Sequence, residues 1–404
     1  RPTRLHQPAV TKLAGSGLCL GQRLPAQPEQ DRHLVAVQRD TALGTGQRPA
    51  YGRRCGALGS HRASVRIDRV GTIVPMQPAT SPGARLTVLA GGIGGARFLQ
   101  GLRAAAPDAE ITVIGNTGDD IWLHGLRVCP DLDTLMYTLG GGADPDRGWG
   151  RREETFHAAE ELTAYGAQPD WFGLGDRDIA THLIRTQMLA ADYPLSAVTA
   201  ALCTRWDLGL TLLPMSDDRV ETHVVISDDA GRRAIHFQEW WVRHRAEIPA
   251  EGFVMVGADD ATPAPGVIDA IGGADAVLLP PSNPVVSIGA ILSVEGIRAA
   301  LRTTAAPVVG VSGIIGGRPV RGMADACLTA IGVSSTAAGV AAHYGARPAG
   351  LLDAWLIDTV DADALAQVTA LGITGLAANT VMTDQVAAAD LARTTLHLAD
   401  RVSR

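Results

Sequence analysis

Residues 86–134 decide the fold of this chain and read LTVLAGGIGGARFLQGLRAAAPDAEITVIGNTGDDIWLHGLRVCPDLDT. A short apolar run at residues 86–90 leads into four closely spaced glycines, which are Gly91, Gly92, Gly94 and Gly95. An apolar-periodic segment begins at Ala96. This order predicts a strand, a tight turn and a helix start, the arrangement that aims backbone N–H groups at a phosphate. Four glycines in five positions exceed what helix–strand packing alone requires.

Acidic residues follow the second expected strand, at residues 110–114. They are Asp119, Asp120, Asp131 and Asp133. Magnesium sites use one or two carboxylates together with phosphate oxygens of the substrate, so this group is a candidate metal site. The structural alternative is that Asp131 or Asp133 caps the helix and that the other two lie in a solvated turn. The sequence leaves open which of the four bind metal directly.

Two expected features of dinucleotide-binding proteins are missing. Arg97 stands where the fingerprint requires its last glycine, and Gly115, Asn116 and Thr117 end the second strand where a ribose-binding acid is expected. A nicotinamide cofactor is therefore disfavoured. Lys12 is the only lysine in the chain, which excludes a phosphate-loop lysine and a lysine base from everything after it. Arginine, histidine, backbone N–H groups or a metal would have to neutralise a phosphate.

The composition describes a folded protein with a large core. The chain has 404 residues, of which 46% are hydrophobic and 19% charged, and no apolar run is long enough to span a membrane. Five scattered cysteines form no paired motif, which favours a reducing cytoplasm. We expect neither a nucleic-acid nor a membrane partner.

The first 84 residues differ from the rest. They contain twelve Lys and Arg against four Asp and Glu, a balance of +8, so the remainder carries about −15 if the whole chain carries −7. They show no sustained hydrophobic period. The sequence starts at Arg1, and Met76 stands just before the first expected strand. We therefore predict a non-native or disordered extension at residues 1–84, with the natural start near Met76.

Residues 85–404 are expected to form a single α/β domain. Strand, loop and helix units repeat, with strands expected at residues 86–90, 110–114, 275–280, 307–312, 355–358 and 375–381. The fold class predicted is Rossmann-like, a doubly wound and mostly parallel sheet with ligands at the carboxyl ends of its strands. A mostly helical insert is expected at about residues 145–209, including a helix at residues 151–165. A β-hairpin is expected from residues 221–227 and 233–238.

Two later strand–helix loops carry small or polar residues that would face the same cleft. The first contains Asn283 and Ser287, and the second contains Gly317, Arg318, Arg321, Met323 and Asp325. The two arginines are suited to a diphosphate, because a guanidinium binds phosphate oxygens in bidentate fashion. Either loop alone would be better explained as an ordinary connection between a strand and a helix. The residues expected to serve as core or packing groups are Trp240, Trp241, His182 and His236.

Six ordered motifs together resemble the 2-phospho-L-lactate transferase family of coenzyme F-420 biosynthesis, including its actinobacterial type, which uses phosphoenolpyruvate. They are GGIGGARFLQGL, NTGDDIWLHGLRVCPDLDT, DPDRGWGRREET, WFGLGDRDIATHL, LLPPSNPVVSIGAIL and GIIGGRPVRGMADACL. The likeness covers residues 86–400. It implies a Mg²⁺-dependent transfer from a guanosine diphosphate joined to lactate or enolpyruvate. The acceptor is Fo, 7,8-didemethyl-8-hydroxy-5-deazariboflavin, whose ribityl hydroxyl is modified while GMP leaves.

The resemblance also assigns roles to residues and implies a homodimer. It implies that Asp119, Asp120 and Asp133 are catalytic and that these three and Asp131 hold the metal. The stretches DPDRGW and WFGLGD would hold the flat deazaflavin ring. The substrate-binding set is Gly91, Gly92, Gly94, Gly95, Asn116, Thr117, Asn283, Ser287, Gly317, Arg318, Arg321, Met323, Asp325 and Trp149.

Two other classes of protein remain as alternatives. A nicotinamide-dependent oxidoreductase would share the fold class but is opposed by the glycine loop and the end of the second strand. A sugar-nucleotide-binding regulatory protein of the same superfamily would share the glycine loop and the NTGDD-like turn. The stretch from DPDRGWGRREET to WFGLGDRD separates the regulator from the transferase, because we associate it with deazaflavin binding.

Overall fold

The computed structural model describes residues 65–67, 73–75 and 83–403. The extension predicted at residues 1–84 therefore lies almost entirely outside the described residues. Within it, β1 (Val65–Ile67) and β2 (Ile73–Pro75) form a two-stranded antiparallel ladder.

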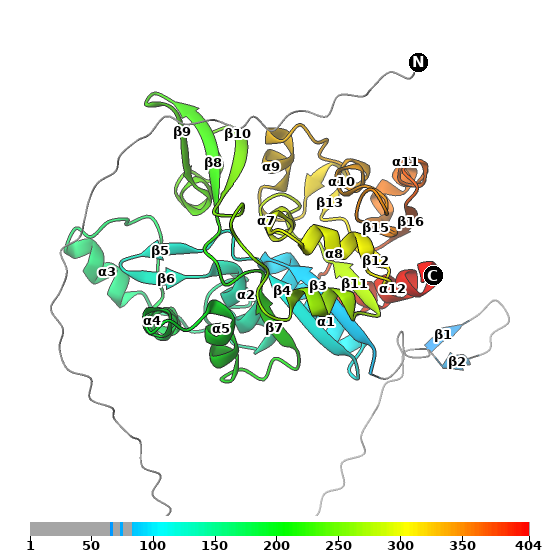
Figure 1. The fold of residues 1–404 in the computed structure, drawn as a ribbon, viewed down its shortest axis with the longest axis horizontal. Coiled ribbons are helices and arrows are strands. Elements are labelled where there is room, and N and C mark those ends of the chain that lie inside the picture. Colours follow the sequence, from blue (N-terminus) through cyan, green and yellow to red (C-terminus); the bar gives the residue numbers. More distant parts are fainter. Residues whose placement is uncertain (1–64, 68–72, 76–82, 404) are drawn as a thin grey trace, which may run out of the picture. The chain divides into compact units, whose positions relative to one another are not determined.

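A seven-stranded sheet forms the centre of the molecule, with strand order β16-β15-β12-β11-β3-β4-β7 (Figure 1). Every neighbouring pair in it is parallel. Its strands are β3 (Arg85–Ala90), β4 (Glu110–Gly115), β7 (Thr211–Pro214), β11 (Ala276–Leu279), β12 (Val308–Val311), β15 (Ala354–Asp358) and β16 (Thr374–Ala378). The predicted fold class is confirmed.

Helices cover both faces of this sheet, because alternate side chains of each strand point to opposite faces. On β3, Leu86 and Val88 belong to one buried cluster and Leu89 to the other. The first cluster includes α1 (Gly92–Ala105), α2 (Pro130–Leu139) and α12 (Gln385–Val402). The second includes α6 (Val267–Gly272), α7 (Ile288–Ser293), α8 (Ile297–Thr303), α9 (Ala324–Ala330), α10 (Ala337–Tyr344) and α11 (Leu365–Ala370).

The strand order places a topological switch point between β3 and β11. From β3 the chain winds through β4 to β7 on one side, and then returns to place β11 on the other side of β3. The loops that leave the carboxyl ends of β3 and β11 therefore run in opposite directions. In open α/β sheets, ligands bind in the crevice that this divergence opens.

Three helices lie between α2 and β7, where the helical insert was expected. They are α3 (His157–Ala164), α4 (Asp176–Ala190) and α5 (Leu195–Cys203). The prediction of a helix from residue 151 was wrong for its first part. Glu153 has a positive φ of 52°, which a helix does not allow. Helix α3 begins only where the Asp176 carboxylate accepts hydrogen bonds from the backbone N–H of His157 (3.1 Å) and of Ala158 (2.9 Å).

The predicted hairpin is confirmed as β8 (Glu221–Asp228) and β9 (Gly231–His236), and it belongs to a larger sheet. A third strand, β10 (Ala250–Val256), pairs antiparallel with β8, giving the order β10-β8-β9 (Figure 1). This strand was not predicted, because Gly252 and an irregular register at Ala250 interrupt its alternation. A short π-helix, η1 (Glu239–Arg243), follows β9.

Smaller elements complete the described structure. Strands β5 (Ile121–Leu123) and β6 (Leu126–Val128) form a tight hairpin that carries the chain from Asp120 to α2. His124 (φ 50°) and Gly125 (φ 77°) make its two-residue turn, which needs positive φ at both positions. The remaining elements are β13 (Ile314–Ile315), β14 (Arg318–Pro319) and the 3₁₀-helix η2 (Thr359–Ala364).

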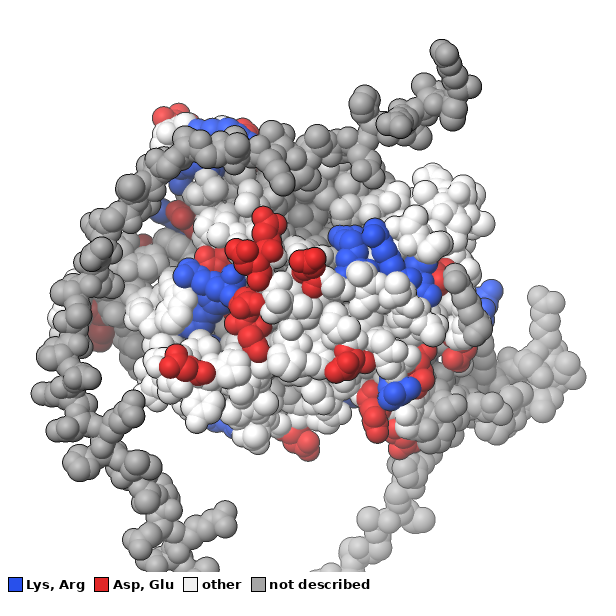
Figure 2. Space-filling view, viewed as in Figure 1, with Lys and Arg blue, Asp and Glu red and all other residues white. Residues whose placement is uncertain are grey.

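The surface carries charges of both signs. On the face shown in Figure 2, acidic and basic side chains lie in small separate groups among uncharged ones. In the part of the chain that the structure describes, no helix combines the length and apolar character needed to cross a membrane.

Candidate functional site

A cavity of about 840 Å³ opens at the carboxyl ends of β3, β11 and β12. Its walls come from the glycine loop, from α2, and from residues 147–150 and 172–182 of the insert. Residues 237–245 close another side, and the loops at residues 280–287 and 319–324 complete it. The cavity thus occupies the switch point of the sheet.

The glycine loop lies against a carboxylate. Helix α1 begins at Gly92, earlier than the expected Ala96, and Gly92 has a φ of 65°. A Cβ at Gly91 would overlap the Asp131 carboxylate and approach the Ser287 Cβ to 2.9 Å. Only glycine therefore allows Asp131 to lie so close to the backbone of the loop. Gly94 and Gly95 face the backbone of Pro281 and the hydroxyl of Ser282.

Ser282 joins the loops that follow β3 and β11. Its hydroxyl accepts a hydrogen bond from the Gly91 N–H at 3.2 Å and donates one to the Gly91 carbonyl at 2.8 Å. These bonds fix the distance between the two loops across the switch point. The sequence analysis did not single out Ser282, although its place in the PPSNP loop was the available signal.

Asp119 and Asp131 form a pair of buried carboxylates linked through one amide. Asn116 Nδ2 donates to Asp119 Oδ1 at 3.1 Å and to Asp131 Oδ2 at 2.9 Å. Gln238 Nε2 donates to Asp119 Oδ2 at 3.0 Å. Burial and the negative charges of Asp131 and Asp120 raise the pKa of Asp119 well above its usual range. Burial also raises the pKa of Asp131 to about 6, although hydrogen bonds from Asn116 and the Gly92 backbone lower it.

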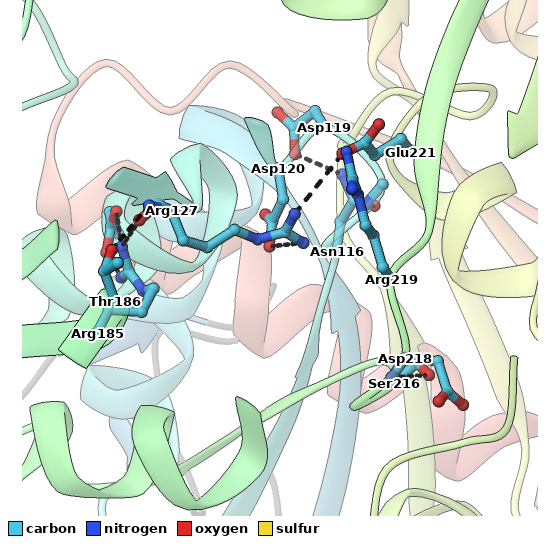
Figure 3. Close-up of polar contacts among 12 residues, drawn as sticks. Asn116, Asp119, Asp120, Arg127, Arg185, Thr186, Ser216, Asp218, Arg219 and Glu221 are labelled. Carbon is cyan, nitrogen blue, oxygen red and sulfur yellow. Dashed lines mark hydrogen bonds and ion pairs between the residues drawn. The ribbon is translucent and has the colours of Figure 1, made fainter. Parts of the chain in front are cut away.

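Asp120 points away from this pair and toward a buried arginine. Arg127 Nη2 lies 3.1 Å from Asp120 Oδ2, and Arg127 Nη1 lies 3.7 Å from Glu221 Oε1, so the guanidinium bridges the β5–β6 hairpin and β8 (Figure 3). Burial raises the pKa of Asp120 to about 6 despite the opposing effect of Arg127. Burial of the carboxyl thus outweighs the charge of the arginine.

Asp133 also has an arginine as its partner. Arg185 of α4 binds both carboxylate oxygens, with Nη1 to Oδ2 at 3.1 Å and Nη2 to Oδ1. His182 Nδ1 lies 3.1 Å from Arg185 Nη1. Burial lowers the pKa of His182 to about 4, so this imidazole is neutral near pH 7. Asp133 therefore ties α2 to the insert through a buried ion pair.

None of the four aspartates has the structural role given as the alternative. Cys129 occupies the N-cap position of α2, which has no side-chain cap, and Asp131 and Asp133 lie in its first turn. Asp119 and Asp120 are buried, 5% and 0% exposed, which excludes a solvated turn. The capping and turn interpretations of the sequence were wrong.

The structure brings some of the predicted substrate-binding residues to the cavity and leaves others away from its lining. Lining residues from the predicted set are Gly91, Gly92, Gly94, Asp119, Asp131, Asp133, Trp149, Asn283, Ser287, Arg321 and Met323. Those that do not line it are Gly95, Asn116, Thr117, Asp120, Gly317, Arg318 and Asp325. Arg318 and Asp325 are exposed, on β14 and α9. Asn116 still shapes the site, because it orients Asp119 and Asp131.

Several cavity residues were not predicted. Trp241 and Arg245 line the cavity from the segment that follows β9, and Trp241 is 36% exposed rather than packed. Arg147 lines another wall, with its guanidinium 5.2 Å from the Trp149 ring centroid. Among described residues, Arg245 and Arg321 are cavity arginines without an ion pair. The signal for Trp241 was the polar and aromatic run at residues 238–241, directly after the hairpin.

The fold and site define an α/β protein with a switch-point cavity, a glycine loop and two carboxylates that have no arginine partner among the described residues. A family model, 2-phospho-L-lactate transferase CofD, matches residues 86–395. The chain belongs to this family, as the sequence motifs predicted.

Curated relatives support the same family. A phosphoenolpyruvate transferase of Streptomyces coelicolor is 65% identical over 318 residues, which cover 79% of this chain and 99% of the relative. Phosphoenolpyruvate transferases of Nocardia farcinica and Thermobifida fusca are 62% and 66% identical, covering 96% and 88% of those proteins. The chain is therefore an enzyme, a transferase of coenzyme F-420 biosynthesis.

A solved structure shares the fold. The crystal structure of protein BH3568 from Bacillus halodurans superposes with a TM-score of 0.53 at 18% identity, covering 78% of this chain and 99% of that chain. A second structure of BH3568, described as a member of the UPF0052 family, gives 0.52 at 16% identity, with 78% and 100% coverage. At this identity the likeness establishes the fold alone.

Proposed function

We propose that this enzyme transfers a phosphoenolpyruvyl group, or a 2-phospho-L-lactyl group, from enolpyruvyl- or lactyl-2-diphospho-5'-guanosine to Fo. The ribityl oxygen of Fo forms a bond to phosphorus, the bond from that phosphorus to GMP breaks, and the hydroxyl proton is released. The product is dehydro coenzyme F-420-0 or F-420-0. The names of the relatives from Streptomyces, Nocardia and Thermobifida support the enolpyruvyl donor.

The observation that carries this proposal is the pair formed by Asp119 and Asp131 beside the glycine loop. Both carboxylates line the cavity, and their hydrogen bonds come from neutral amide, backbone and hydroxyl groups. Burial raises the pKa of both carboxyls, and neither forms an ion pair with an arginine among the described residues. Such a pair fits Mg²⁺, which binds one or two carboxylates and completes its shell with phosphate oxygens and water. When bound, Mg²⁺ would supply Lewis-acid stabilisation of the charge that develops on the transferred phosphoryl group.

The other two aspartates would position the site. Asp120 and Asp133 each face a buried arginine, although burial still raises the pKa of Asp120 and its Oδ1 has no hydrogen-bond partner among the described residues. Asp120 holds the turn that carries Asp119, and Asp133 holds the first turn of α2 that carries Asp131. Arg321 and Arg245 would bind the donor diphosphate from the cavity wall, since no lysine is available there.

Product analysis tests the proposal. The chain is incubated with Fo and either donor, with and without Mg²⁺, and products are identified by mass spectrometry. We expect GMP and a phosphodiester of Fo to form together and only with Mg²⁺, faster with the enolpyruvyl donor. Binding of guanine nucleotide without turnover of either donor would contradict the proposal and favour the regulatory alternative. We also expect a homodimer, which light scattering after gel filtration would detect.

A further inference from the structure

Two polar atoms in one wall of the cavity lack a hydrogen bond of normal geometry to any described residue. They are Asp178 Oδ1, in the first turn of α4, and the Tyr137 hydroxyl, near the end of α2. Both atoms are buried, and neither makes a hydrogen bond of normal geometry with a described residue; only a weaker interaction links Tyr137 to Asp178. Both residues line the cavity. Because buried polar atoms in folded proteins are nearly always paired in good geometry, these two retain hydrogen-bonding capacity for a ligand.

The charged groups nearby are already engaged. Arg185 binds both oxygens of Asp133, and His182 is in contact with Arg185. The guanidinium of Arg151 lies 5.2 Å from the ring centroid of Tyr137 and 4.8 Å from that of Trp206. The two centroids are 5.5 Å apart, so the guanidinium lies over both rings, and its Nε has no hydrogen-bond partner among the described residues. Asp178 and Tyr137 thus remain available to a ligand.

The two atoms form a complementary acceptor and donor. Burial and the charge of Asp133 raise the pKa of Asp178 to about 7, with Glu154 raising it further, and the weak hydrogen bond from Tyr137 and the charge of Arg151 lower it. Burial raises the pKa of Tyr137 well above its usual range, so its hydroxyl keeps its proton. An acceptor beside a donor matches an N–H beside a carbonyl, which is the edge of a lactam or imide.

The wall around this pair suits a flat ring. Trp149 and Phe172 line the same cavity, and Trp149 is 47% exposed. A Cβ at Gly150 would lie 3.7 Å from Asp178 Oδ2, so the backbone beside Trp149 passes directly over the carboxylate. An aromatic face beside a polar pair is typical of sites that stack a heterocycle and read one of its edges.

The pair lies at a suitable distance from the reacting end. Asp131 and Tyr137 both line the cavity from α2 and are six residues apart. A helix rises 1.5 Å per residue, so they are separated by about 9 Å along its axis. A ligand whose ring meets Tyr137 therefore needs a spacer of several bonds to reach Asp131, and a ribityl chain or a ribose with phosphate supplies one.

We propose that Asp178 and Tyr137 bind the N–H and carbonyl edge of a planar lactam or imide in the substrate, and so determine which ring the enzyme accepts. This inference rests on the proposed function, which supplies two rings with such an edge. The pyrimidinedione of Fo is one, and the guanine of the donor is the other. Asp178 accepts from the ring N–H, and Tyr137 donates to the adjacent carbonyl.

Binding measurements on the full chain test this assignment. Fo is titrated by its fluorescence and GDP by calorimetry, against the wild type, Asp178→Ala and Tyr137→Phe. The matched control is Asp170→Ala, an exposed aspartate in the same segment. We expect Asp178→Ala to weaken the binding of one ligand roughly tenfold or more, and Tyr137→Phe to weaken the binding of the same ligand about threefold. The other ligand and the control should be unaffected.

A modified ligand distinguishes recognition from a general loss of structure. Methylating the ring nitrogen of the affected ligand removes its N–H, so the wild type should bind the methylated form at least tenfold more weakly. Asp178→Ala should bind both forms equally. Selective loss of Fo assigns the edge to the acceptor, and selective loss of GDP assigns it to the donor base.

The proposal is overturned if the variants bind both ligands as tightly as the wild type, or if the binding of both ligands weakens equally. It is also overturned if Asp178→Ala still discriminates against the methylated form. In those cases the two atoms are satisfied by water or shape the wall only. Failure of the proposed function itself would be seen separately, as absence of Fo binding and turnover in the unaltered chain.

Discussion

The four buried aspartates of the site divide into two pairs with opposite surroundings. Asp119 and Asp131 are linked by the amide of Asn116 and have no arginine partner in the part of the chain that the structure describes. Asp120 and Asp133 lie one and two residues further along the chain and face Arg127 and Arg185. The first pair therefore lacks positive charge, whereas the second pair has it built in.

This difference indicates which carboxylates are free to bind a cation. A carboxylate held by a buried arginine would have to lose that partner to bind metal, and the arginine would then be buried without a counter-charge. A carboxylate held by amides and hydroxyls loses nothing when a cation approaches. Asp119 and Asp131 are the expected ligands, and Asp120 and Asp133 the supports.

Removing a support should have the largest effect, and it should act on stability. Asp133→Asn leaves Arg185 buried with no counter-charge, so we expect the free energy of unfolding in urea to fall by about 3–5 kcal/mol. Asp390→Asn, which breaks the surface pair with Arg393 at 2.9 Å, is the control and should cost no more than about 1 kcal/mol. If the Asp133→Asn protein is stable and its activity returns with added Mg²⁺, then Asp133 is a metal ligand. The division into metal-binding and supporting aspartates would then be wrong.

Removing a ligand should act on activity instead. Asp131→Asn keeps the size of the side chain but removes the charge that would hold Mg²⁺. We expect turnover to fall about a hundredfold or more, since a metal supplies several kcal/mol of transition-state stabilisation. Initial rates over a range of Mg²⁺ concentrations should show partial recovery. The melting temperature should stay the same or rise, because one of two repelling charges is gone. Near-normal turnover at low Mg²⁺ would refute the metal site.

A similar contrast separates the two arginines of the loop after β12. Arg321 lines the cavity, whereas Arg318 is exposed on β14 and does not. Arg321→Ala should therefore weaken GDP binding by about 1.5–3 kcal/mol, the contribution of a charge-assisted hydrogen bond, as measured by calorimetry. Arg318→Ala is the matched control and should change little. Equal effects would show that the loop adopts another arrangement when nucleotide is bound.

The smallest effect concerns pH. The pKa of Asp178 is about 7 in the folded protein, above the ordinary value of about 3.9 expected when unfolded. Ionised Asp178 thus destabilises the fold, and stability is lost as pH rises from about 4 through 7. Asp178→Asn cannot ionise, so it should melt higher than the wild type at pH 8 by a few degrees, on the order of 1 kcal/mol. This advantage should shrink toward pH 5, and a constant difference across that range would contradict the shifted pKa.

The sequence was sufficient for six of the seven strands of the central sheet, but it did not predict β7 (Thr211–Pro214). Strand–glycine–helix order and apolar periodicity are local properties, and they located β3, β4 and the glycine loop. The partners of the carboxylates depend on tertiary structure. Arg185 is 52 residues from Asp133 in the chain, and nothing local indicates that the two meet. Arg318 and Arg321 are three residues apart, and only Arg321 lines the cavity, which the local sequence does not indicate.

The hydroxyl of Ser282 that joins the two loops has a consequence for biosynthesis of the protein. It bonds to Gly91, 191 residues earlier, and Ser287 reaches Asp131 across 156 residues. The site therefore cannot form until residues 282–287 have left the ribosome, long after the glycine loop has been made. Contacts of such long sequence separation form slowly, and the unfinished sheet exposes an unpaired edge at β3 in the meantime. A nascent chain stalled before β11 would contain the glycine loop and all four aspartates and still lack a binding site.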